Sequence, residues 1–71
     1  MKLPITSYRE LAAKLRRAGF ELVRTSKHDV YCHREKNLTI PLPHHTGDTP
    51  KGLLRAIIRQ MRLSPEEFRN L

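Results

Sequence analysis

The sequence lacks several features that define whole classes of protein. In 71 residues it has one cysteine, Cys32, no tryptophan, and only two tyrosines and two phenylalanines. A single cysteine allows neither an intramolecular disulfide nor a multi-cysteine zinc site, and it favours the reducing cytoplasm as the location of the protein. No apolar run approaches the ~20 residues needed to span a bilayer, and the start Met1-Lys2-Leu3-Pro4 does not resemble a signal peptide. We therefore expect a cytoplasmic protein without a membrane segment.

Acidic residues are scarce as well. Seven Asp and Glu stand against 14 Lys and Arg, which gives a formal net charge of +7 and a pI of about 10.4. An excess of this size on a short chain indicates a nucleic-acid partner, an acidic protein partner, or both. We expect one domain, residues 1–71, which buries only about 60% of the surface of its unfolded chain and leaves little room for a cofactor. Because aromatic side chains are few, recognition of nucleic acid by shape and phosphate contacts is favoured over base stacking.

The N-terminal part of the sequence predicts a helix from Tyr8 to Ala18. Ser7 and Glu10 have the spacing of a capping box. Apolar residues recur at helical spacing after this cap, and Gly19 suits the left-handed turn that ends many helices.

Three short strands are predicted next, over residues 20–25, 29–34 and 38–42. Polar turns separate them, and strands this close in sequence pair as an antiparallel meander. Pro41 cannot donate to a ladder, so the end of the third strand should lie at an edge or a bulge. We expect Tyr31 to point inward, which would place His28 on the accessible face of the sheet.

A second long helix should begin with Thr49 as its N-cap and Pro50 as its first residue. Gly52 in the first turn costs helix stability, and we expect close backbone approach to an RNA phosphate or to the neighbouring strand as compensation. Ser64 and Glu67 repeat the spacing of a capping box and should open a short last helix. The predicted fold is α+β, with a three-stranded antiparallel sheet packed on two helices and a short C-terminal helix.

Basic residues recur along the second helix at steps of four, four and three. This spacing predicts one basic ridge, made of Lys51, Arg55, Arg59 and Arg62. The first helix adds Lys14, Arg16 and Arg17. These side chains could bridge phosphates, although a basic helix face that is merely solvated remains the alternative for each of them.

Four histidines are candidates for proton transfer, because imidazole titrates near pH ~6.5. His28, where a hairpin strand begins, is the first candidate, and the alternative is that it only fills a turn. His33 is predicted to be a half-exposed residue of the sheet. His44 and His45 are adjacent in a loop, and with Cys32 they lack the spacing of a zinc site. We therefore expect no metal.

Several short motifs follow one another over nearly the whole chain. They are Lys2-Leu3-Pro4, the cap from Ser7 to Glu10, Gly19-Phe20, Ser26-Lys27-His28 with Tyr31, Ile40-Pro41, Gly52 to Ile57, and Leu63 to Phe68. In this order and spacing the chain resembles the HicA-type toxins, the mRNA interferases of HicAB toxin–antitoxin modules. The resemblance rests on the combination, since no single motif is specific.

The resemblance implies an α-β-β-β-α fold similar to that of double-stranded-RNA-binding domains. It also implies mRNA as the substrate and a HicB-type antitoxin as the protein partner. Ser26-Lys27-His28 stands where the family has Gly-Ser-His, so the role of catalytic histidine falls on His28.

The first hypothesis is therefore a metal-independent endoribonuclease toxin in which His28 moves a proton while Lys27 and Arg24 flank the scissile phosphate. The RNA backbone would be held by Lys14, Arg17, Lys51 and Arg55. Water, Lys27 or a group of the substrate could act as the second proton-transfer partner. The rival hypothesis is a non-catalytic double-stranded-RNA-binding module, and a third reading treats the basic surface as a docking face for an acidic protein.

Overall fold

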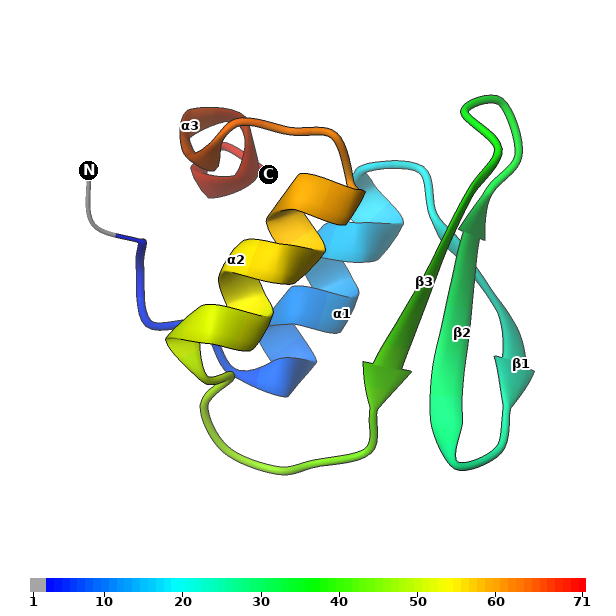
Figure 1. Ribbon diagram of the computed structural model, residues 1–71, viewed down its shortest axis with the longest axis horizontal. Coiled ribbons are helices and arrows are strands. Elements are labelled where there is room, and N and C mark those ends of the chain that lie inside the picture. The colour runs from blue at the N-terminus through cyan, green and yellow to red at the C-terminus, as the bar shows by residue number, and fades with distance from the viewer. Residues whose placement is uncertain (1–2) are drawn as a thin grey trace.

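Two helices cover one face of a three-stranded antiparallel sheet in the computed structural model, which describes residues 3–71 (Figure 1). Along the chain the elements are α1 (Tyr8–Arg17), β1 (Glu21–Thr25), β2 (His28–His33), β3 (Leu38–Pro43), α2 (Lys51–Gln60) and α3 (Pro65–Arg69). The predicted α+β fold is confirmed. Lys2, the first residue of the N-terminal motif, lies outside the described residues. No helix among residues 3–71 is long and apolar enough to cross a bilayer.

The ends of α1 follow from its cap residues. The Ser7 hydroxyl accepts a hydrogen bond from the Glu10 N–H at 3.1 Å, which satisfies one of the free donors of the first turn. At the other end Gly19 has a φ of 98°. The N–H groups of Gly19 and Phe20 donate back to the carbonyls of Arg16 and Leu15 at 3.0 and 2.9 Å. This is the Schellman arrangement, and it brings the chain back toward the sheet.

A single cluster of buried side chains joins the helices to the sheet. Its members are Tyr8, Leu11, Leu15, Phe20, Tyr31, Ile40, Leu42, Leu54, Ile57, Ile58, Met61 and Phe68. No residue of β1 belongs to it, since all five residues of that strand are exposed. β1 is therefore held mainly by its pairing with β2, the central strand of the order β1-β2-β3.

The register of the sheet fixes which side chains face the helices. Tyr31 pairs with Ile40, and both are buried, with exposed fractions of 2% and 0%. Because neighbouring residues of a strand point to opposite faces, His28, Val30 and Cys32 lie on the other face, which we call the open face. The prediction that Tyr31 points inward is confirmed. β3 is an edge strand, as the position of Pro41 required.

The predicted start of α2 is wrong by one residue. Pro50, not Thr49, is the N-cap, and it makes no side-chain cap bond. The Thr49 N–H is instead bonded to the Thr6 carbonyl at 2.7 Å, and the buried Thr49 hydroxyl has no hydrogen-bond partner among residues 3–71. The backbone of Thr49 thus ties the β3–α2 loop to the segment before α1, and the helix begins only after that contact.

The structure excludes one of the two explanations for Gly52 and corrects the extent of the basic ridge, while close approach of Gly52 to an RNA phosphate stays a prediction. A Cβ on Gly52 would meet no atom within 4 Å, so close approach to the neighbouring strand does not explain this glycine. Arg62 does not continue the basic ridge, because α2 ends at Gln60 and Arg62 has a φ of 61°. The N–H groups of Arg62 and Leu63 donate to the carbonyls of Arg59 and Ile58. Arg62 thus occupies the position that Gly19 occupies after α1.

The short helix α3 begins with two reciprocal hydrogen bonds between Ser64 and Glu67. The Ser64 hydroxyl accepts from the Glu67 N–H, and the Glu67 carboxylate accepts from the Ser64 N–H at 2.9 Å. This predicted capping box is confirmed, and the backbone hydrogen bond to Ser64 lowers the pKa of Glu67. Phe68, fully buried, fixes α3 to the core.

Candidate functional site

The β1–β2 hairpin presents His28 at one end of the sheet. His28 is the first residue of β2, its side chain is exposed, and its backbone carbonyl accepts from the Ser26 N–H at 3.2 Å. Neither Ser26 nor Lys27 has a positive φ. The turn therefore needs no glycine, although the chain has Ser26-Lys27 where its resemblance led us to expect Gly-Ser.

The imidazole of His28 is available to a ligand. Within residues 3–71 it makes no hydrogen bond and no ion pair, and it projects from the open face, away from the helices. Its neighbour across the sheet is Pro43, which offers no backbone N–H. Nothing in the fold of the described residues thus fixes or shields the ring.

A β-bulge brings Arg24 to the same face as His28. Leu22 pairs with Tyr31 but Arg24 pairs with Val30, so Val23 is an extra residue in β1. Without this bulge Leu22 and Arg24 would point to the same side of the sheet. With it, Arg24 lies diagonally opposite His28, within reach for a long side chain. The residue pattern does not indicate the bulge, because Val23 looks like an ordinary strand residue.

Lys27 and Lys51 lie at the same end of the molecule as His28. Lys27 is exposed in the turn beside it. In Figure 1 the β1–β2 hairpin, the β3–α2 loop and the N-termini of α1 and α2 all gather at the lower end, which we call the hairpin end. Lys51 is the exposed first residue of α2, and Arg55 lies exposed one turn further along that helix.

Lys14 and Arg17 have a different environment. The Lys14 ammonium donates to the Phe68 carbonyl at 2.9 Å and lies 4.6 Å from the centre of the Phe68 ring. Arg17 donates to the Leu71 carbonyl at 3.3 Å. Lys14 therefore joins α1 to α3, and Arg17 joins α1 to the chain just after α3; sequence spacing did not reveal these roles. Their contact with RNA stays a prediction.

The histidine at the far end of β2 is part of the sheet's packing. The ring of His33 stands edge-on to Phe20, with 5.2 Å between ring centres. Its Nδ1 accepts from the Lys36 N–H at 3.2 Å. A Cβ at Gly19 would lie only 2.9 Å from its Nε2. His33 is half-buried, as expected, and these contacts give it a structural role.

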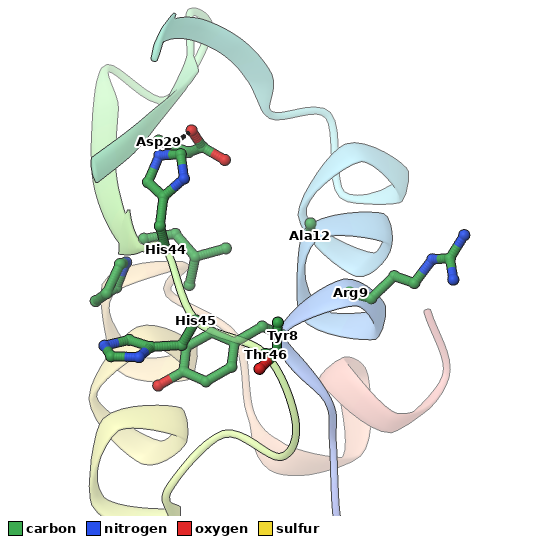
Figure 2. A pocket seen from close by; sticks show the side chains of 9 residues that line it. Tyr8, Arg9, Ala12, Asp29, His44, His45 and Thr46 are labelled. Atoms are coloured by element: carbon green, nitrogen blue, oxygen red, sulfur yellow. Dashed lines mark ion pairs between the residues drawn. The ribbon is translucent and has the colours of Figure 1, made fainter. Parts of the chain in front are cut away.

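His44 and His45, which have no role predicted from the sequence, both lie at a cavity. His44 Nε2 lies 2.8 Å from Asp29 Oδ1, although the atoms are not aligned as a hydrogen bond and Oδ1 has no other partner among residues 3–71. The ring centre of His45 is 5.5 Å from that of Tyr8. Figure 2 shows His44 beside Asp29 and His45 beside Tyr8, both across from Ala12 of α1. The register explains the first contact: Asp29 pairs with Leu42, only two residues before His44.

These arrangements do not assemble a metal site from the described residues. Cys32 and His33 point to opposite faces of the sheet, and Cys32 Sγ lies 3.6 Å from the Thr39 hydroxyl. In the described part of the chain no group of three or more His, Cys, Asp or Glu side chains is placed to hold a metal ion.

Comparison with protein families identifies the chain. Residues 8–63 match the family model described as HicA toxin of bacterial toxin-antitoxin. The chain belongs to the HicA toxin family. It is thus the toxin of a toxin–antitoxin pair, and membership implies an antitoxin partner. The match runs from the start of α1 to just beyond α2 and so includes His28, Arg24 and the cavity. No curated protein matched the chain.

Proposed function

We propose that this HicA-family toxin is a metal-independent endoribonuclease that cleaves mRNA, with His28 as the catalytic residue. The observation that carries the proposal is the position of His28: exposed, without an internal partner, and on the same face as Arg24. The family match and the net charge of +7 support a polyanionic RNA substrate.

RNA brings its own nucleophile to such a site. In the proposed reaction the neutral imidazole of His28 accepts the proton of a ribose 2′-hydroxyl, and the 2′-oxygen attacks the adjacent phosphorus. The bond from phosphorus to the 5′-oxygen breaks, and that oxygen takes a proton from water, which reaches the open face freely. Lys27 and Arg24 offset the charge that develops on the phosphoryl oxygens. No step requires a metal ion.

The remaining basic residues divide into two groups in this account. Lys51 and Arg55 are exposed at and near the hairpin end and hold the RNA backbone. Lys14 and Arg17 contribute their charge to the attraction of RNA while they hold α3 and the chain just after it. A HicB-type antitoxin would inhibit the toxin by covering the open face at His28.

Purified protein incubated with an RNA that has both single-stranded and structured regions, in excess EDTA, tests the proposal. The RNA should be cut by the wild-type chain and not by His28→Ala. Loss of cutting in His33→Ala would reflect damage to the sheet, so that variant is not a second catalytic test, and thermal unfolding of His28→Ala checks that this variant is folded. Equal decay with the wild type and His28→Ala, or none with either, would contradict the proposal. Binding without cutting in both would instead support the non-catalytic RNA-binding module.

A further inference from the structure

We propose that the cavity beside His44 and Asp29 binds one unpaired nucleobase of the RNA and that Asp29 selects bases with an exocyclic amino group. This inference rests on the proposed function only in taking RNA as the ligand. It assigns the cavity to cytosine, adenine or guanine and rejects uracil.

The cavity has the size and the walls of a small-molecule site. Its volume is about 590 Å³, within the range of about 300–1,000 Å³ that is usual for ligand pockets. Ala12 and Leu42 give it an apolar part, and Asp29, His44 and His45 give it polar and ring-shaped walls. A flat heterocycle with polar edges matches this combination.

Asp29 supplies the selectivity. Its side chain is 28% exposed, and one carboxylate oxygen lies against His44. Figure 2 shows the other oxygen turned toward the cavity and α1. An ionised carboxylate only accepts hydrogen bonds, so it pairs with an amino group such as N4 of cytosine. Uracil carries a carbonyl oxygen at the corresponding position, which would face the carboxylate without a proton between them.

His45 supplies a surface for stacking that sequence composition did not suggest. Its exposed ring lies beside the buried ring of Tyr8, tilted by 37°. Stacking on such a ring favours every base to a similar degree, so discrimination among bases falls to Asp29. Arg9 also borders the cavity, but its side chain points away from the cavity, so we assign it no contact with the base (Figure 2).

The cavity and His28 lie on either side of Pro43, the last residue of β3. Pro43 pairs with His28 in the sheet and also lines the cavity. An RNA chain with a phosphate at His28 can therefore pass over the end of β3 and place a neighbouring nucleotide at the cavity. Selection by Asp29 would then set a base preference next to the cut.

Titration of the full-length protein with 5′-CMP and 5′-UMP, followed by NMR of the imidazole C–H groups of His44 and His45, tests the pocket directly. The two nucleotides have the same phosphate charge and nearly the same size, so the basic surface attracts them equally. CMP should shift these resonances and bind at least about fivefold more tightly than UMP. Equal affinities, or no shift with either, would overturn the inference.

Two variants and one control test whether Asp29 causes the preference and whether the nucleotides bind in the cavity. Asp29→Asn should abolish the preference for CMP, because the amide offers a donor as well as an acceptor. Asp48→Asn makes the same change of charge at an exposed residue outside the cavity lining and should retain the preference. Ala12→Met should block both nucleotides by filling the cavity. Thermal unfolding of each variant checks that it is folded. A preference that survives in Asp29→Asn would contradict the assignment.

This test is independent of RNA cleavage. A mononucleotide contains no phosphodiester bond between nucleosides, so its binding is measured without any cleavage. If cleavage fails but CMP is preferred, the pocket stands and the nuclease proposal falls. If cleavage succeeds but CMP and UMP bind alike, only the pocket is lost.

Discussion

At the scale of single residues, the structure separates side chains that look alike in the sequence. The sequence predicted that His28 lies on the accessible face, because alternation along β2 with Tyr31 inward leaves only that choice. It could not assign His44, because the partner of His44 depends on the register between β2 and β3. The sequence also could not separate lysines that stabilise the fold, such as Lys14, from exposed ones such as Lys51. The spacing of charges shows where a basic residue lies but not what it contacts.

Lys14 is expected to contribute to stability and Lys51 is not. Replacing Lys14 by Gln removes a charged hydrogen bond to the Phe68 carbonyl and the contact with the Phe68 ring. We expect the free energy of unfolding to fall by about 1–2 kcal/mol. Lys51→Gln, at an exposed site, should change it by less than about 0.5 kcal/mol. Urea denaturation of both variants measures this difference, and equal losses would contradict the role given to Lys14.

At the scale of elements, the sequence predicted most helices and strands to within one residue, but the causes of the errors differ. The N-cap signal at Thr49 was overridden because its backbone N–H is bonded to Thr6. The bulge at Val23 left no mark in the residue pattern. By contrast, the caps at Ser7 and Ser64 involve only residues three apart, so local sequence was sufficient for them.

The two long helices end in the same backbone arrangement with different residues at the left-handed position. Arg62, with a φ of 61°, carries a conformational cost that glycine would not. We therefore expect Arg62→Gly to raise the free energy of unfolding by about 1 kcal/mol. Gly19→Ala should do the reverse and by more, because its φ is 98° and its Cβ would press on His33. Thermal unfolding of the pair tests this, and a destabilised Arg62→Gly would contradict it.

At the scale of the whole molecule, the fold gathers separate segments at the hairpin end. The α-β-β-β-α order was readable because each element has its own period and its own turn residues. That the β1–β2 hairpin, the β3–α2 loop and the start of α2 meet at one end follows from antiparallel pairing and helix direction together (Figure 1).

The positive charge at the hairpin end should determine how RNA binding depends on salt. The logarithm of the association constant should fall linearly with the logarithm of salt concentration. Lys51→Gln should reduce that slope by roughly 0.7–1. Lys36→Gln is the matched control, because it makes the same change of charge in the β2–β3 turn at the opposite end (Figure 1). Equal slopes in the two variants would show that only net charge matters and that RNA is not held at the hairpin end.

The most direct test of the account is the single-turnover cleavage rate of saturating wild-type and His28→Ala protein on the same RNA, with binding measured in parallel. If His28 moves the proton, the rate should fall by about 10²–10⁴-fold. The affinity for RNA should stay nearly unchanged, since the lysine and arginine side chains supply most of the phosphate binding. A His28→Ala variant that is folded, binds RNA as the wild type does and cleaves it at the same rate would contradict the catalytic role of His28.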